Sequence, residues 1–299
     1  MNKLSINACP LCGGTHLKRV MTCTDFYASG ERFDVMSCED CGFTFTQDVP
    51  VEAEIGRYYE TPDYISHSDT KKGAMNAIYH QVRKYMLGKK ARLVAKESHR
   101  KRGRLLDMGT GTGYFAATME QRGWKVEAIE KNAQARVFAK EHFGLEVKGE
   151  KALQEFEPGS FDVVTLWHVM EHLEHLDETW ECLRGLLSDR GVLIVAVPNC
   201  SSYDAGKYGE YWAAYDVPRH LWHFTPVTIQ QLASKHGFIM AARHPMPFDA
   251  FYVSMLSEKH RGSSFPFVKG MCTGAVAWFS ALGKKERSSS MIYVFRKKR

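Results

Sequence analysis

The 299-residue sequence has no apolar run of signal-peptide or membrane-spanning length. Its N-terminus, MNKLSINACPLC, lacks the apolar core of a signal peptide, and the longest apolar stretch near the other end, residues 271–282, is too short to cross a bilayer. The sequence therefore predicts a cytoplasmic protein without a transmembrane segment. Global disorder is excluded as well, because 44% of the residues are hydrophobic and only 25% are charged.

Because no export signal is present, the eight cysteines are expected to be thiols or metal ligands and not disulfides. Four of them form two C-x2-C pairs, each followed by glycine: Cys9 with Cys12, and Cys38 with Cys41. Four thiolates are the usual donor set of a closed, structural zinc site. A small zinc ribbon with its linker is predicted for residues 1–66. A redox dithiol, which would need a thioredoxin-like setting, and an iron–sulfur centre are the alternatives.

Positive charge is concentrated in one segment. The chain has a formal net charge of +6, yet residues 71–104 hold twelve lysines and arginines against Glu97 alone, so the remainder is net negative. Apolar residues recur at helical spacing from Met75 to Met86, which predicts a basic amphipathic helix beside the main domain. Such a segment is either a solvated helix face or a surface for an anionic partner.

From Leu105 to Val197, short apolar runs alternate with helical segments, which is typical of repeated βαβ units. Strands are expected at Arg104–Met108, Lys125–Ile129, near Glu146, and at Phe161–Leu166, Val192–Val197, Phe238–Ala242 and Ser290–Arg296. Helices are expected at Tyr114–Arg122, Ala133–Phe143, Asp177–Leu187 and Pro226–His236. This order predicts an α/β fold for residues 67–299, with a doubly wound, mostly parallel seven-stranded sheet.

Residues 244–287 separate the last two expected strands, and a connection of that length is usually a lid or a binding loop. We expect a lid over the site. The apolar run MCTGAVAWFSALG within it, flanked by Lys269 and Lys284, is also compatible with a segment that lies on a membrane surface.

The turn LLDMGTGTGYF, residues 105–115, ends an expected strand and opens a helix, with glycines in alternation at Gly109, Gly111 and Gly113. Glycines there let the backbone approach a ligand closely. Tyr114 stands where a dinucleotide site has its third glycine, and Asp107 would repel a pyrophosphate. This acid suits a ligand with an ammonium group, such as the methionyl part of S-adenosylmethionine.

Glu130 closes the next expected strand, where a carboxylate can accept hydrogen bonds from both ribose hydroxyls. With this acid in place, residues 104–242 resemble the class I S-adenosylmethionine-dependent methyltransferases of the ubiquinone and sugar methyltransferase-like group. The resemblance rests on DMGTGTG, VEAIEKN, FDVVTLWHVMEHL and GVLIVAVPN. It implies that Asp107, Gly109, Gly111, Gly113 and Glu130 contact the cofactor, with Trp167 near it. The front module resembles the zinc-binding domain found ahead of sugar C-methyltransferases.

Candidate catalytic residues follow two of the expected strands. His168, Glu171 and His172 come just after Phe161–Leu166, at the strand edge where doubly wound sheets bind ligands. They could act as a base or bind a divalent ion, as a related motif does in the quinone-type enzymes that this region resembles, or His172 could brace the following helix.

A second cluster, in YDVPRHLWHFTP at residues 215–226, contains His220 and His223, and either histidine could be the general base. The aromatic side chains of this region would wall the acceptor site or pack the loop against the sheet: Tyr211, Trp212, Tyr215 and Trp222.

The favoured function is methyl transfer to an oxygen or carbon of a small sugar-, polyketide- or quinone-like acceptor. RNA methylation is the alternative that uses the basic segment, although Leu166-Trp167-His168 differs from the motif that methylates exocyclic base amines. A zinc-dependent scaffold that no longer catalyses is a third reading. The oligomeric state is left open.

Overall fold

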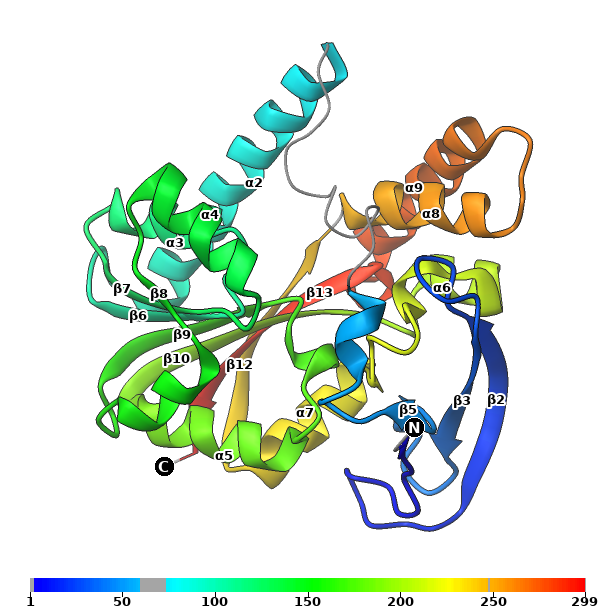
Figure 1. The fold of residues 1–299 in the computed structure, drawn as a ribbon, viewed down its shortest axis with the longest axis horizontal. Coiled ribbons are helices and arrows are strands. Elements are labelled where there is room, and N and C mark those ends of the chain that lie inside the picture. Colours follow the sequence, from blue (N-terminus) through cyan, green and yellow to red (C-terminus); the bar gives the residue numbers. More distant parts are fainter. Residues whose placement is uncertain (1–2, 60–73, 247, 299) are drawn as a thin grey trace.

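The computed structural model describes residues 3–59, 74–246 and 248–298 (Figure 1). The expected boundary at residue 66 and the start of the basic segment at residue 71 lie outside these residues, as do the side chains of Met75 and its neighbours up to Tyr79. The division into two domains at that boundary stays a prediction.

A seven-stranded sheet forms the centre of the molecule, in the order β12-β13-β10-β9-β6-β7-β8. The strands are β6 (Arg104–Met108), β7 (Lys125–Ile129), β8 (Val147–Lys148), β9 (Phe161–Trp167), β10 (Leu187–Pro198), β12 (Phe238–Met246) and β13 (Ser290–Lys297). Neighbouring strands are parallel except at β13, which is antiparallel to both β10 and β12. The predicted doubly wound, mostly parallel sheet is confirmed.

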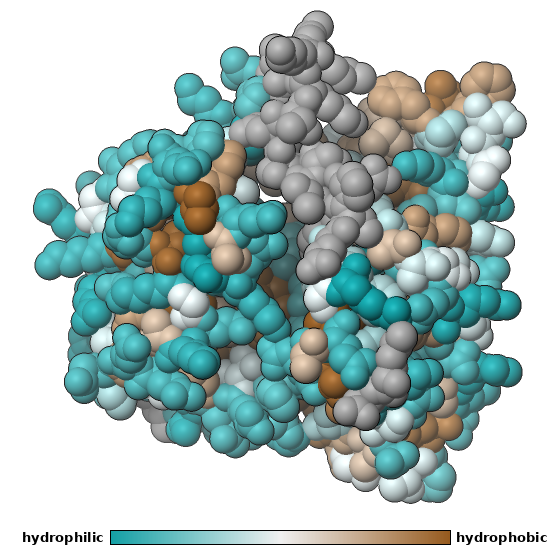
Figure 2. Space-filling model, viewed as in Figure 1, coloured by the Kyte–Doolittle hydropathy of each residue, from teal (hydrophilic) through white to brown (hydrophobic). Residues whose placement is uncertain are grey.

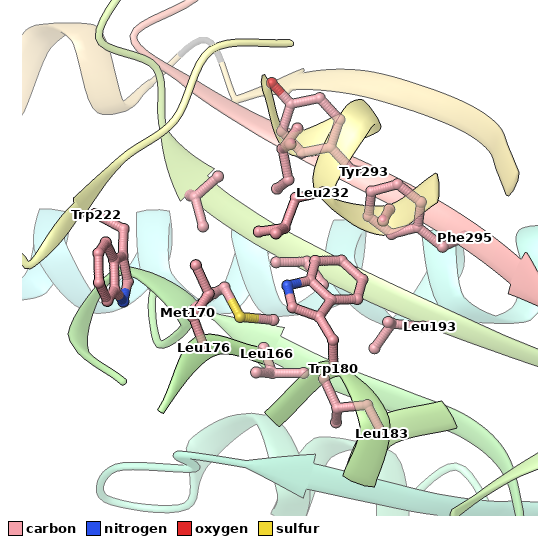
Figure 3. Packing of buried hydrophobic residues seen from close by; sticks show 14 of the residues in the cluster. Leu166, Met170, Leu176, Trp180, Leu183, Leu193, Trp222, Leu232, Tyr293 and Phe295 are labelled. Carbon is pink, nitrogen blue, oxygen red and sulfur yellow. The ribbon is translucent and has the colours of Figure 1, made fainter. Parts of the chain in front are cut away.

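Helices cover both faces of this sheet (Figure 1). On one face lie α2 (Ala74–Ser98), α3 (Tyr114–Glu120) and α4 (Ala133–Phe143), and on the other α5 (Leu176–Leu186) and α7 (Pro226–Lys235). Figure 3 shows the core on the second face, where Trp180 and Leu183 of α5 and Leu232 of α7 meet the sheet residues Leu193 and Phe295. Burial of these large apolar side chains fixes the sheet that carries the site.

The N-terminal module has a sheet that the main domain completes. Its strands are β2 (Leu17–Thr24), β3 (Arg32–Cys38) and β4 (Thr44–Thr46), while β1 (Lys3–Leu4) pairs with β5 (Val49–Pro50). The fourth strand, β11 (Trp222–His223), comes from the segment after β10 and pairs antiparallel with β4. Phe43 and Phe45 of the module belong to the same apolar core as Trp222 and the sheet. The module is therefore packed into the main domain.

The segment between β12 and β13 is a helical hairpin, α8 (Asp249–His260) and α9 (Pro266–Gly283), which projects from the body beside α6 (Tyr203–Tyr208) (Figure 1). Short 3-10 helices complete the fold: Ile55–Tyr58, Glu150–Glu155, Met170–His172, Gly209–Tyr211, Ala213–Tyr215 and Lys285–Arg287. Within the described residues, no helix is long and apolar enough to cross a membrane. The lid role and the cytoplasmic location stay predictions.

Candidate functional site

The glycine loop between β6 and α3 requires glycine at its first and last glycine positions. Gly109, Gly111 and Gly113 all have positive φ, and a Cβ atom at Gly109 would collide with the side chain of Val169. Gly113 caps α3 in the left-handed conformation, and a Cβ there would press on Ala139. The loop thus brings a bare backbone to the carboxyl edge of the sheet, where doubly wound folds bind ligands.

Asp107, at the end of β6, is a buried carboxylate held by two hydroxyl donors. Thr110 Oγ1 and Thr165 Oγ1 each donate a hydrogen bond of 2.6 Å to it. Burial raises the pKa of Asp107 to about 6, although the two hydroxyls and the nearby Lys90 favour the ionised form. The group is therefore ionised at neutral pH and ready to receive a cationic ligand atom.

Glu130 lies just past β7 and faces the glycine loop. Its carboxylate accepts the backbone N–H of Gly111 at 2.8 Å and that of Asn132 at 2.9 Å. The glycine loop and the two acids, which the sequence predicted as one cofactor site, therefore do meet at one edge of the sheet. Their donor and acceptor types fit S-adenosylmethionine: an anionic group for its ammonium, and a carboxylate for ribose hydroxyls.

Trp167, the last residue of β9, lies beside this edge. Phe115 packs edge-on against its ring at 5.2 Å, and the ammonium of Lys90 stands 4.3 Å from the ring centroid. The indole Nε1 is buried and has no hydrogen-bond partner within the described residues. An unsatisfied buried donor here fits a site that a ligand completes.

Lys90 and Asp249 are two members of this edge that the sequence did not single out. Burial lowers the pKa of Lys90, while Asp249 and Asp107 oppose that shift. Lys90 was hidden among the many cations of the basic segment, and Asp249 is the first residue of α8 in the segment predicted as a lid. An isolated lysine and an isolated aspartate carry no spacing signal that could have found them.

His168 lies between two carboxylates. Its φ of 58° turns the chain sharply after β9, so that Nδ1 stands 3.4 Å from Glu171 and Nε2 3.3 Å from Asp249. Burial alone would lower the pKa of His168, but the two carboxylates raise it to about 9. The imidazole is therefore a cation at neutral pH.

Glu171, His172 and His220 gather behind His168. Glu171 is fully buried, and its carboxylate faces His168 Nδ1 at 3.4 Å. The two imidazole rings are 4.5 Å apart, and one ligand atom from each of the three residues lies within 4.8 Å of the others. His172 Nδ1 contacts the carbonyl of Arg219 at 3.0 Å, and His220 Nδ1 contacts that of Ala214 at 2.8 Å. Both Nε2 atoms are thus left with a lone pair.

Tyr59, from the end of the described part of the linker, also reaches this cluster. Its hydroxyl is 3.1 Å from His172 Nδ1, across 113 positions of sequence. Burial and the nearby His220 lower the pKa of His172 to about 4, so its ring is neutral. The sequence offered no signal for Tyr59, because it lies in an acidic, tyrosine-bearing stretch with no motif of its own.

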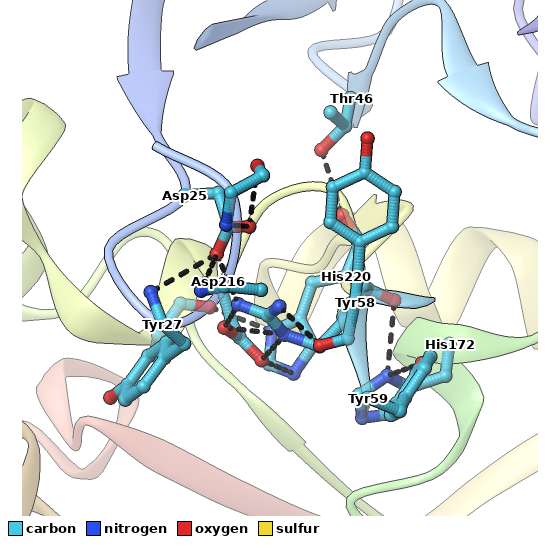
Figure 4. Close-up of polar contacts among 12 residues, drawn as sticks. Asp25, Tyr27, Thr46, Tyr58, Tyr59, His172, Asp216 and His220 are labelled. Carbon is cyan, nitrogen blue, oxygen red and sulfur yellow. Dashed lines mark hydrogen bonds and ion pairs between the residues drawn. The ribbon is translucent and has the colours of Figure 1, made fainter. Parts of the chain in front are cut away.

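Arg219 ties the N-terminal module to the loop that carries His220. The guanidinium is fully buried and donates to Asp25 at 2.9 Å, to Asp216 at 2.6 Å and to the carbonyl of Tyr58 at 2.8 Å. Figure 4 shows these contacts converging between Asp25 and Asp216, next to His220. The position of His220 therefore depends on an ion pair between residues 25 and 219.

His223 is placed apart from these residues. Its Nε2 is 2.9 Å from Thr46 Oγ1 of the module, and burial lowers its pKa to about 3. The neighbouring aromatic side chains of Trp212, Tyr215 and Trp222 are buried in the packing between module and main domain. Of the two interpretations left open for those aromatics, the packing role fits their burial.

The four paired cysteines converge on one point. The Sγ atoms of Cys9 and Cys41 are 3.5 Å apart, those of Cys12 and Cys38 are 3.6 Å apart, and all four lie within 4.8 Å of one another. A tetrahedral zinc with Zn–S bonds of about 2.3 Å places its sulfurs roughly 3.8 Å apart. Each pair is followed by a glycine with positive φ whose N–H bonds to the carbonyl of the first cysteine. The donor set fits structural zinc.

A family model described as a methyltransferase domain matches residues 78–242. The chain belongs to this methyltransferase family. With the sheet order and the cofactor edge described above, it is a class I, S-adenosylmethionine-dependent methyltransferase, which confirms the predicted fold, enzyme class and cofactor. The individual site residues stay predictions.

Solved structures of methyltransferases have similar folds at low sequence identity. A S-adenosylmethionine-dependent methyltransferase from Archaeoglobus fulgidus is 16% identical, with a TM-score of 0.49, and the match covers 78% of this chain and 99% of that chain. The 1,6-didemethyltoxoflavin-N1-methyltransferase of Burkholderia thailandensis is 14% identical, with a TM-score of 0.48 and coverage of 87% and 98%. The geranyl diphosphate C-methyltransferase of Streptomyces coelicolor is 13% identical, with a TM-score of 0.49 and coverage of 80% and 86%. No curated protein matches this methyltransferase.

Proposed function

We propose that this methyltransferase methylates an oxygen or carbon of a small-molecule acceptor, with His220 as the general base. The observation that carries the proposal is the contact of the cofactor edge with a partly buried histidine cluster: His168 pairs with Asp249 of that edge and with Glu171, which lies beside His220. Bound S-adenosylmethionine supplies a methyl group on sulfonium, which is an activated leaving group. What the chain must add is alignment, exclusion of water and removal of one proton.

His220 suits that proton transfer better than the other histidines. His168 is already a cation between its two carboxylates. His223 is hydrogen-bonded to Thr46, where the N-terminal module packs against the main domain. His220 has its Nδ1 fixed by a backbone carbonyl, and its Nε2 is 3.8 Å from Asp216. That carboxylate would stabilise the imidazolium that forms when His220 takes a proton from the acceptor.

We assign His168 and His172 to positioning roles. The ion pair of His168 with Asp249 joins the end of β9 to α8 beside the cofactor edge. His172 packs edge-on against the ring of His220. Glu171, His172 and His220 also offer the ligand atoms for a divalent ion, and under that alternative the metal would bind the acceptor. Turnover of the zinc-loaded enzyme with and without added Mg²⁺ separates the two, because base catalysis needs no divalent ion beyond the structural zinc.

The acceptor is small in this proposal because the side chains of the histidine cluster are largely covered by the rest of the protein. Only 12% of the His220 side chain is exposed. A flipped RNA base would need an open approach lined with aromatic and basic side chains. A sugar-, polyketide- or quinone-like molecule is the acceptor class that we infer, and the intact cofactor edge argues against a non-catalytic scaffold.

We further propose that Cys9, Cys12, Cys38 and Cys41 hold a structural zinc ion. Four thiolates leave no open coordination position for a substrate, so the metal would act on folding and not on chemistry. The zinc site would influence the acceptor site through β4, which pairs with β11 just after the loop that carries His220. Thr46 of β4 also donates a hydrogen bond of 2.7 Å to the carbonyl of His220.

The proposal is tested by His220→Gln beside His223→Gln. Turnover is measured with a panel of sugar nucleotides and phenols, and cofactor affinity by titration with S-adenosylhomocysteine. We expect His220→Gln to lower kcat by roughly 100-fold or more, as loss of a general base does, with unchanged cofactor affinity. His223→Gln should leave kcat near the wild-type value. Equal, small losses in both variants would refute His220 as the base.

A further inference from the structure

Helix α9 presents large apolar side chains to solvent. Seven of them on and just before the helix are 40–67% exposed: Phe265, Phe267, Val268, Met271, Val276, Phe279 and Leu282. At 100° per residue they span one half of the helix circumference. Figure 2 shows tan and brown side chains gathered over the α8–α9 hairpin at the upper right. Soluble proteins rarely leave so continuous an apolar surface uncovered.

The opposite side of α9 holds the hairpin together with small residues. Gly270, Gly274, Ala277 and Ala281 are buried, and a Cβ atom on Gly270 or Gly274 would collide with the backbone of α8. This close contact between helix backbones resembles helix pairs that pack in lipid. Since the fold uses only the small side, the large apolar side chains are not needed to hold α9 in place.

The charges around this apolar face are mostly positive, and the exposed Glu286 that follows them is paired with Arg243. No acidic residue occurs from residue 259 to residue 285, whereas five cations do, and all five are exposed: Lys259, Arg261, Lys269, Lys284 and Lys285. Lys259 and Arg261 lie at the end of α8, before the turn into α9. Lys269 lies in the first turn of α9, and Lys284 and Lys285 follow its last residue. Apolar side chains bordered by cations are complementary to a bilayer with anionic headgroups.

Helix α2 extends the same surface. Its exposed Tyr85 packs edge-on against Phe248, just before α8, and Lys89 lies over the rings of both residues. Figure 1 shows the start of α2 and the α8–α9 hairpin projecting from the same side of the molecule. The exposed cations of α2 therefore add to the charge of the hairpin on that side.

We infer that the outer face of α9, with the adjoining start of α8 and the middle of α2, docks this methyltransferase on an anionic membrane surface. The helix lies in the plane of the interface, with its apolar half among the upper acyl chains and its lysines among the headgroups. The inference stands on the exposed helices and is independent of the proposed acceptor and base.

The same observations disfavour other occupants of this face. A second copy of the chain would bring two clusters of five cations together, which costs association energy. RNA would use the cations but would leave the apolar half of α9 exposed to water. Of the occupants compared, only a membrane with an apolar interior and anionic headgroups pairs with both the apolar half of α9 and the cations around it.

The test is flotation of the full-length protein with vesicles of phosphatidylcholine alone or with about one third phosphatidylglycerol. We expect stronger binding to the anionic vesicles. Val268→Asp with Val276→Asp should weaken that binding by about ten-fold or more, because two charges enter the acyl region. The matched control is Val137→Asp with Val227→Asp, two valines of similar exposure on α4 and α7, which should bind as the wild type does.

Charge is tested separately. Lys269→Glu, Lys284→Glu and Lys285→Glu together should weaken binding to anionic vesicles on the order of 100-fold, at roughly five-fold per removed cation. Exposed Lys125→Glu with Lys151→Glu elsewhere should change it far less. The inference is overturned if the wild type does not float with anionic vesicles, or if either pair of variants and controls behaves alike. A dimer broken by the valine changes, or RNA binding without vesicle binding, would also overturn it.

Discussion

The two halves of the site are held in different ways. The cofactor half is built within consecutive βαβ units: Asp107 and the glycine loop follow β6, and Glu130 follows β7 about twenty residues later. The acceptor half joins Asp25 of the module to Arg219 and Tyr59 to His172, over 194 and 113 positions of sequence. The first half is built mainly from the sheet and the turns that follow its strands. The second is held by buried contacts with the N-terminal module.

This difference gives the zinc module a role in the acceptor half. The module supplies Thr46 to the carbonyl of His220, Asp25 to Arg219 and the strand partner of β11. The cofactor edge has a weaker link of this kind, an ion pair at the surface between Glu52 and Lys131 beside Glu130, while the residues around Asp107 come from β6, the loop after it, β9 and α2. Loss of the module should therefore disable the transfer of methyl groups while leaving a protein that still binds cofactor.

The largest expected effect is that of breaking the proposed zinc site. Cys38→Ser removes one thiolate and should release the metal, which structural sites need for folding. We expect acceptor turnover to fall on the order of 100-fold or more, while affinity for S-adenosylhomocysteine stays near that of the wild type. Zinc content, turnover and calorimetric titration measure the three quantities.

The control for this change is Cys182→Ser, an exposed cysteine of α5 outside the module. It should alter neither zinc content nor turnover. If Cys38→Ser lost zinc and kept full turnover, the two halves would not differ in their dependence on the module.

A smaller effect is expected from breaking the ion pair between Asp25 of the module and Arg219 of the main domain. Asp25→Ala leaves the buried guanidinium of Arg219 without one of its carboxylates, and breaking a buried pair costs about 3–5 kcal/mol of stability. Asp34→Ala, in the same module, removes a partly exposed carboxylate that lies 3.6 Å from Arg19 and accepts a hydrogen bond from Thr22, and should cost about 1–2 kcal/mol. Thermal unfolding of the two variants measures the difference. Similar losses in both would mean that Arg219 does not anchor the module.

The same contrast explains how far sequence reasoning reached. In the cofactor half, the sequence could indicate the glycine loop, Asp107 and Glu130 as one site, because they follow strand ends at fixed spacing, whereas Lys90 carried no such signal. The seven strands followed from alternating apolar and helical runs. Tyr59, Asp249 and the Asp25–Arg219 pair were out of reach, because their meaning lies in contacts between distant segments. The strand β11 was missed for the same reason, since two residues carry no periodicity.

The smallest expected effect is a pH dependence that belongs to the cofactor half alone. Burial raises the pKa of Asp107 to about 6 from its usual 3.8, so the folded state holds this proton more tightly than the unfolded chain does. Protonation of Asp107 thus favours the unliganded fold at low pH, and that contribution is lost as the pH rises through 6. Binding of an ammonium has the opposite sign, because it needs the ionised carboxylate.

Affinity for S-adenosylhomocysteine should therefore fall as the pH drops below 6, by at most about ten-fold per pH unit. Asp107→Asn should bind S-adenosylhomocysteine weakly at every pH, without a fall in affinity below pH 6. Glu130→Gln should bind it less tightly than the wild type does but should still lose affinity below pH 6, because Asp107 remains. Titration calorimetry between pH 5 and pH 8, with folding checked at each pH, separates these cases. A wild-type affinity that is flat across this range would place the ammonium away from Asp107 and would remove the electrostatic distinction between the two halves.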